Sequence, residues 1–185
     1  MKRLYLFGAG GHGRELAWLA EDVTDGDVDL VFLVDESRYL GAALNGIPIK
    51  LIQEEKFQPD SEFLVAIGDP TLRRKAASMF PDSLRAATLV HPSVLRSSRT
   101  HVADGVVLCA GTILTDNVSI GQHTHVNVAC TISHDVVLGK FVTLSPGVHI
   151  AGNVNVEDEV FIGIGATIIS GSLGRPLIIG KGSVV

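Results

Sequence analysis

The hydrophobic positions of this chain follow two different periods, and the change lies near residue 88. The first part contains three short apolar runs, at residues 4–7, 30–34 and 63–67. Runs of this length and composition predict buried parallel strands. Helical spacing of apolar residues between them predicts helices over 14–20 and 71–79, with Leu72, Ala76 and Met79 facing the core. The alternation predicts a small α/β unit.

From Val102 onward, one residue in every six is aliphatic. The series comprises Val102, Leu108, Leu114, Ile120, Val126, Ile132, Leu138, Leu144, Ile150, Val156, Ile162 and Ile168. The residue four places after each of these is small or β-branched. A period of six sustained over twelve repeats does not fit helices and is typical of a parallel β-solenoid.

A second feature of these repeats is the residue three places after each aliphatic position. It is Gly, Asn, Asp or His in nine of the twelve repeats. These types tolerate a positive φ best, so each repeat is expected to turn a corner there. The register breaks at 171–176 and resumes at Ile179, which predicts a loop projecting from the coil.

Composition and charge restrict the class of protein. The 185 residues are 46% hydrophobic, and 15 Lys and Arg against 20 Asp and Glu give a net charge of −5. This balance disfavours nucleic acid or an anionic membrane as the main partner. No apolar run approaches the roughly 18 residues of a membrane helix, and the first one stops too early, at Gly8, for a signal peptide. Two cysteines cannot form a disulfide framework, so a reducing compartment is the default and we expect a cytoplasmic protein.

The two parts together resemble the left-handed β-helix sugar acetyltransferases, in which three hexapeptides form one triangular coil. The motifs that carry the resemblance are Gly8-Ala9-Gly10-Gly11-His12-Gly13, Phe32-Leu33-Val34-Asp35, Ala66-Ile67-Gly68-Asp69, His91-Pro92-Ser93 and Ile132-Ser133-His134-Asp135. As a set they are similar to UDP-4-amino-sugar N-acetyltransferases of the bacillosamine type and to sialic acid O-acetyltransferases. The resemblance implies a Rossmann-like, nucleotide-sugar-binding α/β domain over 1–88, a left-handed β-helix over 89–185, and a homotrimer.

The glycine-rich loop has the spacing of a dinucleotide-binding fingerprint, because Gly8, Gly10 and Gly13 form G-x-G-x-x-G. Bare glycines before a helix let backbone N–H groups meet phosphate. A unit of about 88 residues leaves little room for two mononucleotide halves, so NAD is disfavoured, and a simple tight turn is another interpretation. The resemblance implies a nucleotide sugar instead. The residues implied are Gly10, Gly11 and His12 at phosphate or sugar, Asp35 at the ribose or base, and Gly68 allowing close approach.

Among the histidines, spacing alone places His134 at a solvated corner. The resemblance implies that His134 is the catalytic base and Asp135 its supporting carboxylate. A neutral imidazole can take the proton from an amine or hydroxyl that attacks a thioester. Asp116, 18 residues earlier, is a second candidate partner for the imidazole. Gly152, 18 residues later, is expected to leave space for a substrate.

The acyl donor implied by the resemblance is acetyl-CoA, bound on the outer face between subunits by Thr143, Ile164 and Lys181. No metal is expected. Three alternatives stay open: a sugar O-acetyltransferase, a zinc carbonic anhydrase of the same solenoid fold, and a non-catalytic trimeric scaffold. The zinc enzyme needs three converging histidines, and the candidates are His123, His125, His134 and His149.

Overall fold

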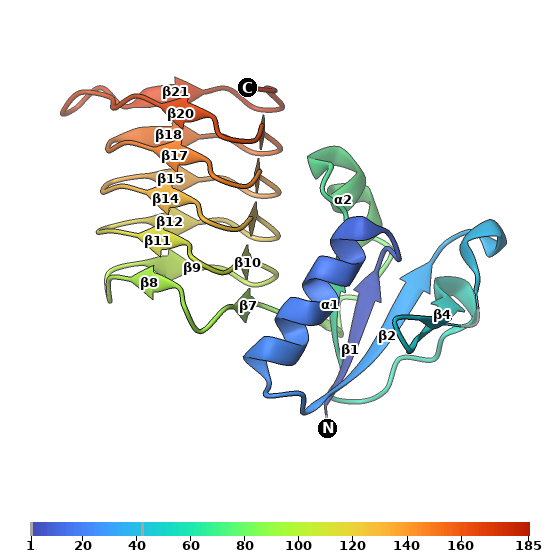
Figure 1. Ribbon diagram of the computed structural model, residues 1–185. Coiled ribbons are helices and arrows are strands. Elements are labelled where there is room, and N and C mark those ends of the chain that lie inside the picture. Colours follow the sequence, from blue (N-terminus) through green and yellow to red (C-terminus); the bar gives the residue numbers. More distant parts are fainter. Residues whose placement is uncertain (1, 42) are drawn as a thin grey trace. The chain divides into compact units, whose positions relative to one another are not determined.

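The computed structural model describes residues 2–41 and 43–185, which form two compact units. The first unit comprises the chain up to residue 68 together with 72–87, and the second comprises 69–71 with 88–185. Figure 1 follows the chain through both of them. Each unit has a hydrophobic core of its own.

The first unit is built on a largely parallel sheet of six strands. In spatial order these are β3 (Ala43–Leu44), β4 (Ile47–Leu51), β2 (Val28–Val34), β1 (Lys2–Phe7), β5 (Glu62–Val65) and β6 (Arg85–Ala86). Only the short β3 runs antiparallel to its neighbour among the described strands. The three central strands β2, β1 and β5 are the apolar runs of the sequence, so the α/β prediction is confirmed.

Helix α1 (Gly11–Val23) packs against β1 and β2 and buries Leu16 and Ala20. Two short 3₁₀ turns, η1 (Ser37–Tyr39) and η2 (Ile52–Glu54), lie in the segment that leads to β5. Of the helices in the described residues, none is long and apolar enough to cross a membrane.

The prediction for the second helix was partly wrong. Helix α2 runs over Pro70–Ala77, and the side chains of Leu72 and Met79 are 55% and 42% exposed. Its buried positions are Pro70, Arg73 and Ala76. The guanidinium of Arg73 donates from Nη1 to the carbonyl oxygens of Ile67 and Gly68, at 2.7 and 3.0 Å. These bonds satisfy a cation at a core position, and Leu72 therefore turns outward.

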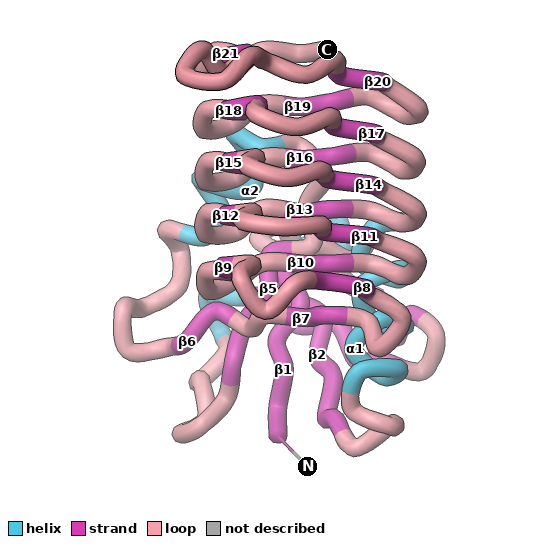
Figure 2. The backbone as a smooth tube through the Cα atoms, turned by 90° about the vertical axis from the view of Figure 1, so that its left-hand side faces the viewer, coloured by secondary structure: helices cyan, strands magenta, loops and turns pink. Residues whose placement is uncertain are grey.

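The second unit is a left-handed parallel β-helix, and each coil adds one short strand to each of three sheets (Figure 2). One sheet contains β7 (Leu89–Val90), β10 (Val107–Leu108), β13 (His125–Val126), β16 (Thr143–Leu144) and β19 (Phe161–Ile162). The next contains β8 (Leu95–Arg96), β11 (Ile113–Leu114), β14 (Thr131–Ile132), β17 (His149–Ile150) and β20 (Thr167–Ile168). The third contains β9 (His101–Val102), β12 (Ser119–Ile120), β15 (Val137–Leu138), β18 (Val154–Val156) and β21 (Leu177–Ile179).

The aliphatic column of the repeat forms the core of the solenoid, as the sequence predicts. Paired residues of neighbouring coils are 18 apart, as Val107 and His125 are. The first coil begins at Leu89, before the aliphatic series that starts at Val102. The series misses this coil because Arg96 occupies the position that pairs with the inward Leu114. Arg96 is exposed on the terminal strand of its sheet, where a charged side chain reaches water.

The corners have the predicted left-handed backbone. The residue three after each aliphatic position has a positive φ from Gly105 through Gly165, and this includes Ala129, Phe141 and Glu159. These three types disfavour that conformation, so the geometry of the coil imposes it.

Gly171 differs, because its φ is not positive. A Cβ there would lie 2.3 Å from the carbonyl oxygen of Asn153, so glycine is needed for close backbone approach. It is the first residue of the predicted loop, in which Ser172 and Arg175 pair antiparallel. The loop adds five residues, since Val156 pairs with Ile179, 23 positions away instead of 18.

Replacing Ala129 by glycine should stabilise the protein. Ala129 is exposed with φ +58°, and glycine removes the left-handed penalty, so we expect a gain of about 0.5–1 kcal/mol in the free energy of unfolding. Ala103→Gly, outside the left-handed region, should lower it by a similar amount. Urea unfolding measures both, and a loss in Ala129→Gly would contradict an imposed corner.

Candidate active site

A pocket of about 470 Å³ opens at the carboxyl ends of β1, β2 and β5. Its polar rim includes Gly10, Asp35 and Lys75, and its wall includes Tyr39 and Leu72. The chain passes from β1 to β2 on one side and later returns to β5 on the other. Open α/β sheets bind ligands at such a switch point, and the apolar wall with few polar groups suits a flat heterocycle.

The glycines of the loop serve two different purposes. Gly8 has φ +113°, and a Cβ on Gly13 would lie 2.1 Å from the carbonyl oxygen of Gly8. These two glycines are therefore required by the turn and by the close packing of α1 on the sheet. Around Gly10, no described atom lies within 4 Å of a Cβ position, and its φ of −89° suits any residue. The fold therefore gives no reason for glycine at this position.

Gly10 is the N-cap of α1, and among the described side chains none caps this helix end. The backbone N–H groups of the first turn are thus available to an anion. Gly11 is equally open, because the nearest described atom to its Cβ position is Arg14 Nη2 at 3.9 Å. The loop can therefore accept a phosphate in close contact.

Of the other residues expected at this site, Asp35 follows β2 on the rim and its carbonyl accepts from Gln53 Nε2. His12 and Gly68 are not part of the lining. His12 lies in the first turn of α1, with Nδ1 3.2 Å from Glu15 Oε2. Burial lowers the pKa of His12, and the hydrogen bond that its ring donates to Glu15 opposes this shift. Gly68 holds Arg73, a structural residue that the periodicity did not reveal.

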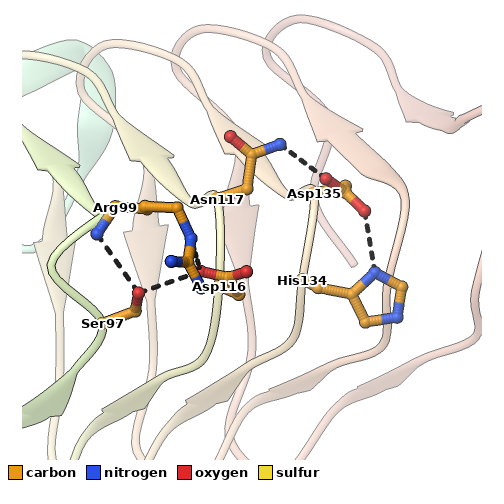
Figure 3. Close-up of polar contacts among 6 residues, drawn as sticks. All are labelled: Ser97, Arg99, Asp116, Asn117, His134 and Asp135. Carbon is orange, nitrogen blue, oxygen red and sulfur yellow. Dashed lines mark hydrogen bonds and ion pairs between the residues drawn. The ribbon is translucent and has the colours of Figure 1, made fainter.

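A second polar site lies at the solenoid corner between β14 and β15 (Figure 3). Nδ1 of His134 is 2.9 Å from Oδ2 of Asp135, and the two side chains are 65% and 51% exposed. Asp135 Oδ1 accepts a hydrogen bond from Asn117 Nδ2 at 2.5 Å. The structure thus brings the two predicted residues into direct contact. It adds Asn117, which the sequence indicated only as a corner residue.

The carboxylate that contacts the imidazole is that of Asp135. The hydrogen bond from Asn117, and then that from His134, lowers the pKa of Asp135. Asp116 Oδ1 instead accepts from Arg99 Nε at 2.6 Å and from Ser97 Oγ at 2.9 Å, and these bonds lower its pKa. The second candidate partner is therefore engaged one coil away (Figure 3).

The sequence led us to expect that Gly152 leaves open space for a substrate, and the structure shows that it does not. A Cβ there would lie 2.5 Å from Cε1 and 2.6 Å from Nε2 of His134. The imidazole ring itself fills that space. Glycine at this position therefore lets the ring lie against the backbone of the next coil.

The three residues expected at acetyl-CoA are spread around the solenoid. Thr143 is buried on β16, between His125 and Phe161 of the adjacent strands. Ile164 is 81% exposed at the corner between β19 and β20. Lys181 follows β21, and its Nζ is 3.3 Å from Glu159 Oε1. Within one chain, none of these described positions shares the corner of His134.

The remaining histidines are likewise dispersed. His123 stacks on Phe141 with ring centroids 5.0 Å apart, and His149 Nδ1 is 2.8 Å from Thr131 Oγ1. Across residues 2–41 and 43–185, no group of three His, Cys, Asp or Glu side chains is arranged to hold a metal ion.

Comparison with known proteins gives consistent matches over the whole chain. The family model for the PglD N-terminal domain matches residues 3–80. A GDP-perosamine N-acetyltransferase from Escherichia coli O157:H7 is 31% identical over 184 residues, covering 96% of this chain and 82% of that protein.

Two solved structures are also similar. WeeI from Acinetobacter baumannii AYE has a TM-score of 0.90 at 29% identity, covering 100% of this chain and 88% of that one. The acetyltransferase domain of PglB from Neisseria gonorrhoeae FA1090, in complex with acetyl coenzyme A, has a TM-score of 0.62 at 26% identity, covering 99% and 95%.

Gly152→Ala should displace the imidazole of His134 without unfolding the protein. The atoms that meet the new methyl group belong to an exposed ring, which can swing away and lose its bond to Asp135. Gly121→Ala is the contrast, because its Cβ would meet the backbone of Gly139 at 2.6 Å and should destabilise the fold. A crystal structure and the thermal midpoint of each variant test this, and an unmoved ring in Gly152→Ala would contradict it.

Proposed function

The chain belongs to the left-handed β-helix sugar acetyltransferases with a PglD-type N-terminal domain, and we propose that it acetylates the amino group of a nucleotide-linked sugar with acetyl-CoA. The observation that carries the proposal is the exposed pair of His134 and Asp135 at one solenoid corner. The name of the E. coli relative, which specifies N-acetylation of GDP-perosamine, supports it. The PglB domain bound to acetyl coenzyme A supports the choice of donor.

His134 acts as the general base. Its Nδ1–H donates to Asp135, so the lone pair of Nε2 accepts the proton of the attacking amine. The new C–N bond forms at the thioester carbonyl as the C–S bond breaks, and the proton passes from the imidazolium to the departing thiolate. Asp135 stays ionised, because its hydrogen bonds lower its pKa, and it stabilises the imidazolium.

The pocket of the first unit holds the nucleotide. Gly10 and Gly11 let the diphosphate approach the N-terminus of α1. Neutral His12 in the same turn directs Nδ1–H at Glu15, so its Nε2 accepts from a hydroxyl group of the sugar. Asp35 on the rim contacts the ribose or base. Gly68 allows close approach, because no described atom lies within 4 Å of its Cβ position. The resemblance in the motifs favours UDP as the nucleotide of the sugar substrate, whereas the E. coli relative acts on a GDP-linked sugar. Measuring the binding of both nucleotides distinguishes the two.

The donor site requires more than one copy of the chain. Thr143, Ile164 and Lys181 lie away from the corner of His134 in a single chain, so a neighbouring subunit of a homotrimer presents them to it. The same assembly places acetyl-CoA along the outer face of the solenoid. Cys109 and Cys130 form no disulfide, which supports a reducing, cytoplasmic location.

The experiment that tests the proposal is an acetyl-transfer assay with acetyl-CoA and GDP- and UDP-linked 4-amino sugars, followed by mass spectrometry. Acetylation of the amine is the expected result. Transfer only to sugar hydroxyl groups would establish the O-acetyltransferase alternative. No acetyl-CoA binding would favour a non-catalytic scaffold, and bound zinc with carbon dioxide hydration would favour the carbonic anhydrase.

His134→Ala should lower kcat by about 10²–10⁴-fold, the usual contribution of a general base. The side chain is 65% exposed, so the thermal midpoint should change little. His101→Ala, an exposed histidine on β9, is the control and should retain activity within about twofold. Steady-state kinetics at saturating substrate measures both, and full activity of His134→Ala would remove His134 from the mechanism.

Gly10→Ala should fold normally and bind nucleoside diphosphates about tenfold more weakly, because its methyl group enters space that only a ligand uses. Gly13→Ala, whose Cβ meets the Gly8 carbonyl, should instead lose stability. Isothermal titration with GDP and UDP, together with thermal unfolding, separates the two effects. Unchanged affinity of Gly10→Ala for both nucleotides would place the diphosphate elsewhere.

A further inference from the structure

We propose that Asn117 is a positioning residue for His134, acting through Asp135 across two coils of the solenoid. Asn117 lies one coil before Asp135, and their side chains are joined by the bond from Asn117 Nδ2 to Asp135 Oδ1 at 2.5 Å. Asp135 Oδ2 in turn contacts His134 Nδ1 at 2.9 Å. Figure 3 shows this three-residue chain, which runs along the corner. The inference rests on the proposed role of His134 as the base.

The backbone prepares this arrangement. Asn117 and Asp135 both have left-handed φ angles, +54° and +58°, at equivalent corners 18 residues apart. Their side chains therefore leave the chain in the same direction, one strand spacing apart. Glycine satisfies this corner geometry elsewhere, at Gly111 and Gly147 for example. The fold thus requires a left-handed residue at 117, and the amide is what glycine cannot supply.

The chemistry of Asp135 fits a donor on each side. A carboxylate only accepts, and its two oxygens here are divided between Asn117 and His134. With Oδ1 held, the carboxylate cannot rotate without breaking a bond, so Oδ2 stays directed at Nδ1. The Asn117 amide is a neutral donor. It holds the Asp135 carboxylate without neutralising the negative charge that stabilises the imidazolium.

The groups around the Asn117–Asp135–His134 series also favour a positioning role for Asn117. Asp116 precedes Asn117, and its negative charge repels the like charge of Asp135. Arg99 and Ser97 hold the carboxylate of Asp116, with Arg99 Nε at 2.6 Å. On the other side, the absence of a Cβ at Gly152 gives the His134 ring room to lie against the next coil. The imidazole is therefore accommodated by a glycine on one side and oriented by the Asn117–Asp135 pair on the other.

The test is a double-mutant cycle with glycine, which preserves both left-handed corners. Asn117→Gly should lower kcat about tenfold, a part of what the base itself contributes, with KM for both substrates within about twofold. In an Asp135→Gly background, the same substitution should change kcat by less than about twofold. An equal loss in both backgrounds, or no loss in either, would overturn the proposal.

The matched control is Asn153→Gly, at the same corner one coil after Asp135 and two coils after Asn117, with φ +61°. Its amide donates to the carbonyl oxygen of Ser172 and not to Asp135. It should keep kcat within about twofold of the wild type. A tenfold loss of kcat in this control as well would show that any glycine substitution at this corner lowers activity, and it would overturn the proposal.

A spectroscopic readout separates this inference from the proposed function. Nitrogen-15 NMR of the histidine ring in the full-length protein should show the Nδ1–H tautomer for neutral His134, and a mixture of tautomers in Asn117→Gly. An unchanged tautomer would overturn the positioning role whatever the activity. If the wild type acetylates none of the acceptors but the tautomer shifts, the proposed function fails and the positioning role stands.

Discussion

Parallel pairing of every short strand with the strand one coil away is the constraint on which the solenoid depends. A strand of two residues has little stability alone, so each is held by the strand of one or both neighbouring coils and by the aliphatic column inside. The pairing fixes a separation of 18 residues between stacked positions. That separation aligns Asn117 with Asp135, and the ring of His134 with Gly152. The chemistry of the corner is thus a direct product of the register.

The repeat was predictable from sequence because its inward positions obey a simple period. The left-handed corners were predictable for the same reason, although Phe141 and Ala129 show that the coil can impose the conformation on unfavourable residues. Position 96 escaped prediction, because an arginine interrupts the aliphatic series where the terminal coil is open to water. Periodicity describes the interior of a solenoid well and its ends poorly.

The candidate sites were predictable only in part. The resemblance proposed His134 and Asp135 as the base and its carboxylate, and the structure shows that they are in contact. Spacing alone would have left them as solvated corner residues. The contact between Asn117 and Asp135 joins two coils, and no linear pattern records it. Arg73 was missed because a buried cation satisfied by two carbonyl oxygens is indistinguishable in sequence from a surface arginine. In the glycine-rich loop, the sequence marks Gly8, Gly10 and Gly13 alike, and only the packing separates turn glycines from an open one.

The five additional residues after Gly171 have a consequence for how such a chain can change. They enter between β20 and β21, the same corner that carries His134 two coils earlier, and β21 still pairs with β18. A corner can therefore lengthen while the sheets on both sides keep their register. Evolution, or a designer, can use this freedom to build new surface along this corner of the solenoid while the folding unit remains the same.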